Sequence, residues 1–165
     1  MTLLIRSLDA TRDHARVMAF LHSAADYIRL ERGADPSPGV AHEFFTDCPP
    51  GCDPAQSVRL GVFVQGDLIA ITEMAMGYPD AHTTYLGFLL IAPLARGRRL
   101  GTYALQYLQS RARGMGATAL CLGVLQANPR GLAFWQREGF QPTGHTGPVT
   151  LGQKTQPAQR LRKPL

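Results

Sequence analysis

The segment Leu89–Thr102 constrains the fold more than any other part of the chain. An apolar run ends at Pro93, and a short loop with three arginines and Gly97 follows it. From Leu100 the apolar residues recur at helical spacing, so a strand, a basic loop and a helix follow one another directly. Unpaired N–H groups in the first helical turn, a close glycine backbone and forked arginine donors all favour an anion. We therefore expect a pyrophosphate site in this loop.

Alternating and helical apolar patterns divide the rest of the chain into regular elements. Strands are expected at residues 3–8, 58–65, 68–76, 83–91 and 117–126, with two more between 141 and 165. Helices are expected after residue 11, after Pro93 and from Asn128 to Gly139, with a short one at 40–45. Asn128 would cap the start of the last helix, and a Schellman motif at Gly139 would bring Trp135 and Phe140 together. The sequence thus predicts one α/β (α+β) domain over residues 1–165. Its element order is β-α-β-β-β-α-β-α-β-β.

Composition excludes several classes of protein. With 45% hydrophobic and 18% charged residues among 165, the chain is typical of a folded globular protein rather than a disordered one. The longest uncharged apolar stretch, Tyr85–Ala95, is too short to span a membrane, and the first residues do not resemble a signal peptide. Three cysteines at no regular spacing suit a reducing cytoplasm. We expect a cytoplasmic protein without a membrane partner.

The net charge of +5 is compatible with nucleic acid or with a phosphate-rich small molecule. No aromatic stacking platform is interleaved with the charges, so we expect no nucleic-acid partner. Cys48 and Cys52 lie four positions apart in a proline-rich loop, without a second cysteine pair. This spacing is a poor match to a zinc site, and we expect no metal.

Two motifs together resemble those of one family. Arg96-Gly97-Arg98-Arg99-Leu100-Gly101 resembles the R-x-x-G-x-G/A signature of GNAT acetyltransferases, and the residues from Asn128 to Phe140 are similar to the family's N-x-x-A-x-x-F-Y-x-x-x-G-F element. The number of residues between these two motifs also fits the family pattern. The resemblance implies a GNAT-like fold with a mixed, mostly antiparallel sheet, acetyl-CoA (coenzyme A) as cofactor, and acetyl transfer to an amine.

The resemblance also implies which residues bind the cofactor. The backbone of the strand end would hold the pantetheine arm, and the loop with the first helical turn would hold the pyrophosphate. Asn128 would contact the pantetheine or the acetyl end, and Trp135 would lie beside the thiol. The implied set is Leu89, Leu90, Ile91, Arg96, Gly97, Arg98, Arg99, Leu100, Gly101, Thr102, Asn128 and Trp135.

Three positions depart from the family pattern. Arg99 stands where a glycine is usual and must accept its backbone geometry, and Gly131 replaces an alanine. Trp135 stands where a tyrosine is common, and that tyrosine is assigned to protonate the leaving thiolate. An indole N–H is no such acid, so the thiolate would leave unaided or take a proton from water. Trp135 also keeps open a second hypothesis, a non-catalytic acyl-CoA-binding sensor.

Glu73 is the best candidate for the general base. It shares a strand face with Ile71 and Ala75, and an apolar face raises the pKa of a carboxyl group. A salt-bridged strand residue is the competing interpretation, and Asp80 and His82 are weaker candidates. By resemblance, the backbone N–H of Ile91 would donate to the oxyanion.

The acceptor is the part that the sequence does not identify. Tyr27, Phe44 and Phe45 are candidates for its pocket, although core packing explains them nearly as well. The acceptor class is the amine of a small molecule or a peptide. A homodimer is compatible with the sequence, but no particular residue argues for one.

Overall fold

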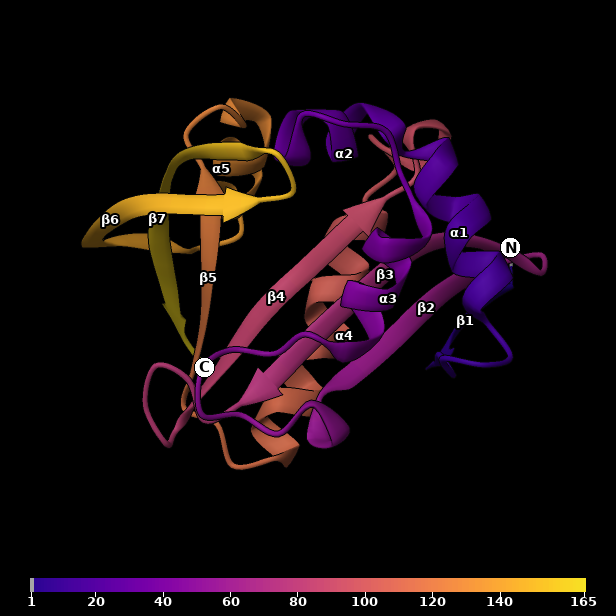
Figure 1. Ribbon diagram of the computed structural model, residues 1–165. Helices are drawn as coiled ribbons and strands as arrows, with labels where there is room; N and C mark the ends of the chain where they lie inside the picture. Colours follow the sequence, from indigo (N-terminus) through magenta and orange to yellow (C-terminus); the bar gives the residue numbers. More distant parts are fainter. Residues whose placement is uncertain (1) are drawn as a thin grey trace.

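The computed structural model describes residues 2–165, so Met1 of the expected 1–165 domain lies outside the described residues. Seven strands form one sheet in the order β1-β2-β3-β4-β5-β7-β6, with helices on both faces (Figure 1). Neighbouring strands are antiparallel except β4 and β5, which are parallel. The strands are β1 (Leu3–Ser7), β2 (Val58–Val64), β3 (Asp67–Met76), β4 (Thr83–Ile91), β5 (Ala119–Leu125), β6 (Gln141–Leu151) and β7 (Lys154–Pro164). This architecture confirms the predicted fold class and the predicted order of elements.

The helices differ from the prediction at one point. The apolar stripe after residue 11 is buried as expected, but Ala24 divides it between two helices rather than one. The α-helices are α1 (His14–Ser23), α2 (Ala25–Arg32), α3 (Pro38–Thr46), α4 (Leu100–Gly114) and α5 (Pro129–Arg137), with short 3-10 turns at Pro54–Gln56 and Pro93–Ala95. None of the helices within residues 2–165 is long and apolar enough to cross a bilayer.

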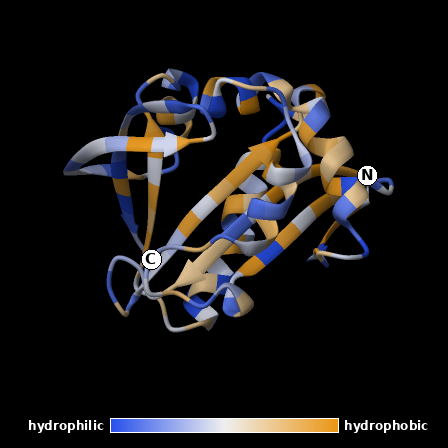
Figure 2. Ribbon diagram, viewed as in Figure 1, coloured by the Kyte–Doolittle hydropathy of each residue, from blue (hydrophilic) through white to orange (hydrophobic). Residues whose placement is uncertain are grey.

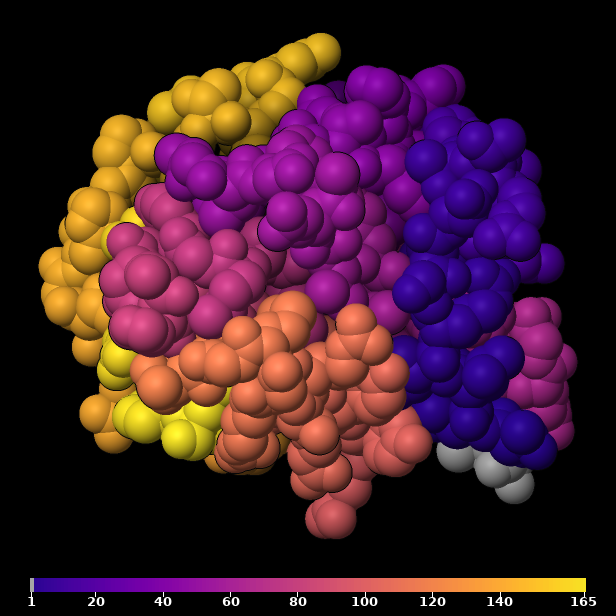
Figure 3. Space-filling view, turned by 90° about the horizontal axis from the view of Figure 1, so that it is seen from below, coloured from indigo at the N-terminus to yellow at the C-terminus, as the bar shows by residue number. Residues whose placement is uncertain are grey.

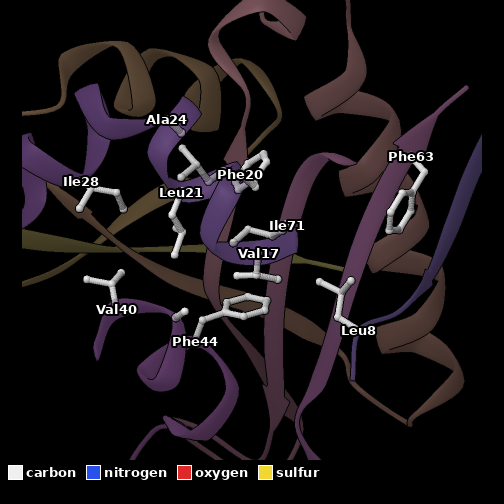
Figure 4. Close-up of a cluster of buried hydrophobic side chains, with 12 residues drawn as sticks. Leu8, Val17, Phe20, Leu21, Ala24, Ile28, Val40, Phe44, Phe63 and Ile71 are labelled. Carbon is white, nitrogen blue, oxygen red and sulfur yellow. The ribbon is translucent and has the colours of Figure 1, made fainter. Parts of the chain in front are cut away.

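Apolar side chains pack in separate clusters on the two faces of the sheet. On one face, α1 and α3 cover β3, and Val17, Phe20, Phe44 and Ile71 point toward one another (Figure 4). On the other face, α4 buries Leu105 and Leu108 against the sheet. The central strands are accordingly the most apolar part of the molecule, and the loops around them are polar (Figure 2). Burial of this apolar area is what holds the helices to the sheet.

The strands β4 and β5 diverge. They pair only from Thr83 to Tyr85 on β4, and beyond that point they separate (Figure 1). The backbone of the later part of β4 is therefore left without a strand partner on one side. This split in the sheet positions the site described below.

The β6–β7 hairpin returns toward the end of α2. The side-chain amide of Gln156 donates to the carbonyls of Leu30 and Glu31 at 3.1 Å each, and Lys154 Nζ donates to Leu30 at 3.1 Å. These bonds satisfy carbonyls that the end of a helix leaves without partners.

In the space-filling view, the gold and yellow C-terminal segments and the indigo N-terminal segment lie on opposite sides of the molecule (Figure 3).

Candidate active site

A cleft of about 960 Å³ opens where β4 and β5 separate. One wall is the second half of β4, the other is β5 with α5, and the loop before α4 closes one end. Eleven of the twelve cofactor residues implied by the resemblance line this cleft. The exception is Arg98, whose side chain is exposed outside it.

The backbone of β4 offers hydrogen-bonding groups to the cleft. Ala92 donates to the carbonyl of Ile69 at 2.8 Å, and Ile91 lies opposite Ala70. Bonded and non-bonded pairs alternate along an antiparallel ladder, so the N–H groups of Ile91 and Leu89 point away from β3. The cleft therefore has backbone donors in the places expected for a pantetheine arm and for an oxyanion.

The loop before α4 adopts the left-handed conformations that bring successive N–H groups together. Gly97 has φ 76° and Arg99 has φ 60° with ψ 11°. Arg99 is the N-cap residue of α4, which confirms that it accepts the backbone geometry of the usual glycine. The N-terminus of α4 opens toward the cleft, and such a terminus favours a phosphate group.

Two side chains of this loop region are held by other parts of the protein. The Arg96 guanidinium pairs with Asp26 of α2 at 2.5 and 3.2 Å, and its Nε donates to the Ile91 carbonyl at 3.0 Å. That ion pair lowers the pKa of Asp26. Thr102 Oγ1 donates to Glu138 at 2.6 Å. Through these contacts, Arg96 and Thr102 hold the loop before α4 against β4, α2 and the end of α5.

Asn128 and Gly139 define the two ends of α5 as the sequence predicts. Asn128 Oδ1 accepts from the Gly131 N–H at 2.9 Å, and a methyl group on Gly131 would overlap the Asn128 amide. At the other end, Phe140 donates to the Trp135 carbonyl at 2.9 Å and Gly139 to that of Gln136 at 3.1 Å. This is the predicted Schellman motif. The overlap with Asn128 explains why residue 131 is glycine rather than alanine, and the Schellman motif explains how α5 ends.

Trp135 packs edge-on against Phe140, with ring centroids 5.2 Å apart. It also contacts Phe134 in the same way at 4.8 Å, and it lines the cleft. The predicted contact between Trp135 and Phe140 is thus confirmed.

Sequence reasoning missed two further arginines of the cleft. Arg130 and Arg137 line it from α5, and Arg137 lies 5.5 Å above the Phe134 ring. Their seven-residue spacing, which puts both on one helix face, is the signal that would have found them. Four arginines line the cleft, Arg96, Arg99, Arg130 and Arg137, against two carboxylates, Asp26 and Glu138, so the cleft has an excess of positive charge.

A second cavity of about 280 Å³ adjoins the first on the α2–α3 face of the sheet. Glu73 lines it, is only 6% exposed, and its Oε1 has no hydrogen-bond partner among residues 2–165. Burial raises the pKa of Glu73 to about 7, although the positive charge of Arg59 opposes the shift. A carboxyl group with this pKa exchanges protons readily near neutral pH.

Gly87 leaves the space that the Glu73 carboxylate occupies. The β3–β4 register shifts after Glu73, since Glu73 lies opposite Phe88 and Met74 lies opposite Leu86, which leaves Gly87 as the extra residue of a bulge. A methyl group on Gly87 would overlap Glu73 Oε2. Glycine here lets the carboxylate lie against the β4 backbone.

The candidate acceptor residues divide between the cavity and the core. Tyr27 and Phe44 line the second cavity, and Tyr27 also lines the first. Phe45 lines neither cavity and stacks instead on His14, with centroids 6.5 Å apart. The weaker base candidates Asp80 and His82 also lie outside both cavities, because the Asp80 carboxylate accepts from Thr83 and from the His82 N–H to close a turn.

Comparison with known proteins agrees with this geometry. A model of the acetyltransferase (GNAT) family matches residues 23–140, well over half of the chain. The chain belongs to the GNAT acetyltransferase family. Members of this family transfer an acetyl group from acetyl-CoA, which identifies the class of the protein.

Solved structures share the fold over nearly the whole chain. An acetyltransferase from Thermus thermophilus is 24% identical with a TM-score of 0.78, covering 100% of this chain and 98% of its own. The ribosomal-protein-S18-alanine N-acetyltransferase from Escherichia coli is 17% identical with a TM-score of 0.69 and coverages of 99% and 94%. The ribosomal-protein-alanine N-acetyltransferase from Brucella melitensis is 19% identical, with a TM-score of 0.72 and coverages of 98% and 99%.

Proposed function

We propose that this protein is an N-acetyltransferase that moves the acetyl group of acetyl-CoA to a primary amine by direct attack on the thioester. The observation that carries the proposal is the junction of the two cavities at the β4–β5 split. Tyr27, Gly87, Phe88, Gly123 and Leu125 line both. A basic cleft for the acyl donor thus meets a cavity that contains a buried carboxylate.

Acetyl-CoA supplies the thioester and a leaving thiolate, and the residues of this chain do the rest. The basic loop and α5 bind the phosphates, and the β4 backbone aligns the pantetheine arm. The N–H of Ile91 donates to the carbonyl oxygen, which becomes more negative as the amine attacks. Glu73 accepts the proton that the nitrogen loses.

The reaction balances without an acid at residue 135. A bond forms between the amine nitrogen and the acetyl carbon while the bond between that carbon and sulfur breaks. The thiolate takes its proton from water, which a reference thiol pKa of about 8.5 permits. Trp135 then serves as a wall of the cleft, a role that its packing on Phe134 and Phe140 supports.

The competing hypothesis is a sensor that binds acyl-CoA without turning it over. The sensor hypothesis is favoured by the tryptophan at residue 135, which cannot protonate a leaving thiolate. Glu73 favours the enzyme, since a sensor has no use for a buried ionisable group in the wall of the second cavity, against the Gly87 that lines both cavities.

The decisive experiment is a screen for release of free coenzyme A from acetyl-CoA over a panel of primary amines. We expect amine-dependent turnover, with Glu73→Gln slowing it by about 10²-fold or more. In the native enzyme the rate should rise through a pKa of about 7, and that rise should be missing in the variant. Tight binding of acetyl-CoA without turnover of any amine would establish the sensor instead.

A further inference from the structure

Acidic side chains outnumber basic ones in the walls of the second cavity. Four carboxyl groups line it, those of Glu31, Glu43, Asp47 and Glu73, against the single guanidinium of Arg32, and burial raises the pKa of both Glu31 and Glu73. Arg32 is shared by Glu31 at 3.3 Å and Glu43 at 2.6 Å. Arg32 therefore pairs with two of the four carboxyl groups. The other two, Asp47 and Glu73, line the cavity without an ion-pair partner in the part of the chain that the structure describes.

Arg59, whose positive charge acts on Glu73, is held outside the cavity by main-chain carbonyls. Arg59 donates to the main-chain carbonyls of Phe44, Pro54 and Asp47 at 2.7 to 2.8 Å, and it does not line the cavity. Its positive charge opposes the effect of burial on the pKa of Glu73, but Arg59 and Glu73 do not form an ion pair among residues 2–165. The exposed Asp47 side chain takes part in none of the ion pairs formed by residues 2–165.

Aromatic rings form the apolar part of the same cavity. Phe88 lies between Tyr27 and Phe44, with ring centroids 6.3 and 6.0 Å away and both pairs edge-on. Aromatic faces attract ammonium groups and also pack against alkyl chains. Carboxylates and rings together suit an alkyl chain that carries positive charge, and they repel an anionic group.

We propose that the acceptor is an alkyl amine with a second positive charge and without a carboxylate near its reacting nitrogen. This inference rests on the proposed acetyl transfer. The reacting nitrogen would lie beside Glu73, near Gly87 at the junction with the cleft, and the second cation would lie toward Asp47. A diaminoalkane and a lysine-containing basic peptide share this chemistry.

The test compares acceptors of equal chain length in the native protein: butylamine, 1,4-diaminobutane and 4-aminobutyrate. The second positive charge should raise kcat/KM by about tenfold over the monoamine, mainly through KM, and the carboxylate should lower it. Added salt should reduce the advantage of the diamine, because salt screens charges near the surface. A basic peptide with one free lysine, tested beside the diamine, distinguishes the two sources of this chemistry.

A matched pair of variants locates the charge that is responsible. Asp47→Asn should reduce kcat/KM for the diamine by about threefold or more relative to its effect on kcat/KM for the monoamine. Asp67→Asn removes another exposed carboxylate, at the β2–β3 turn and outside both cavities, and should change neither rate.

The outcomes separate this inference from the function on which it rests. Turnover of the monoamine or the amino acid at rates equal to or above that of the diamine would overturn the inference alone. Equal effects of Asp47→Asn on the monoamine and the diamine would overturn it too. Binding of acetyl-CoA with no acetylation of any amine would instead overturn the proposed function.

Discussion

The Glu73 carboxyl group has two properties that follow from its surroundings. Its neighbours on the strand are apolar, and the bulge at Gly87 holds it against the β4 backbone. An ionised carboxylate is costly in such a place, so the folded protein keeps the proton up to a pKa of about 7. The sequence predicted this much from the apolar face of the strand.

The raised pKa makes a prediction about stability that does not depend on activity. In the unfolded chain a glutamate titrates near pH 4.3, so between that value and about 7 the folded state binds the extra proton. The contribution of the neutral carboxyl group is full below about pH 4 and is lost as the pH rises through about 7. Glu73→Gln should therefore unfold with a free energy about 3 kcal/mol higher than the native chain at about pH 8, and with a nearly equal one at about pH 4. Urea unfolding at both pH values measures the difference, and a constant difference would contradict the raised pKa.

Arg99 makes a second prediction at the scale of a single residue. Its left-handed backbone disfavours any residue with a side chain, by about 1 kcal/mol relative to glycine. Arg99→Gly should consequently be more stable than Arg99→Ala by about that amount, although both lose the same positive charge. Chemical denaturation of the two variants gives the comparison. If Arg99→Ala proved the more stable, the left-handed geometry of the loop would be wrong.

Among the elements, β4 carries most of the site. It gives backbone donors to the cleft at Leu89 and Ile91, and it borders the second cavity at Gly87 and Phe88. Its bounds were predicted correctly because an uninterrupted apolar strand between a turn and a proline is a strong local signal. The bulge was not predicted, since it depends on the register with β3 rather than on β4 alone.

The bulge can be tested with Gly87→Ala. The added methyl group displaces the Glu73 carboxylate, so acetyl transfer should fall about tenfold or more while the affinity for acetyl-CoA changes little. In a Glu73→Gln background the same substitution should add almost nothing, because both changes act on one group. Gly147→Ala, in open space on β6, is the control. Independent, additive losses would show that Gly87 acts by another route.

At the scale of the whole molecule, the two halves of the site differ in how far sequence predicts them. The proposed cofactor half consists of two continuous segments, which local signals such as the Asn128 cap and the Gly139 turn predict. The proposed acceptor half is assembled from α2, α3, the sheet and the β6–β7 hairpin, which lie far apart in the chain. The Arg96–Asp26 pair spans seventy residues in the same way. No local pattern reveals such contacts, so the position of Phe45 in the core and the negative charge of the cavity came only from the fold.

Binding of acetyl-CoA in the cleft between β4 and β5 is the central claim, and a calorimetric titration tests it directly. We expect one site per chain with a Kd in the micromolar range, roughly −8 kcal/mol, and weaker binding as salt is added. Replacing both Arg130 and Arg137 with alanine should weaken binding without unfolding the protein, since both lie at the rim. The absence of heat and of any thermal shift at millimolar acetyl-CoA would contradict the central claim.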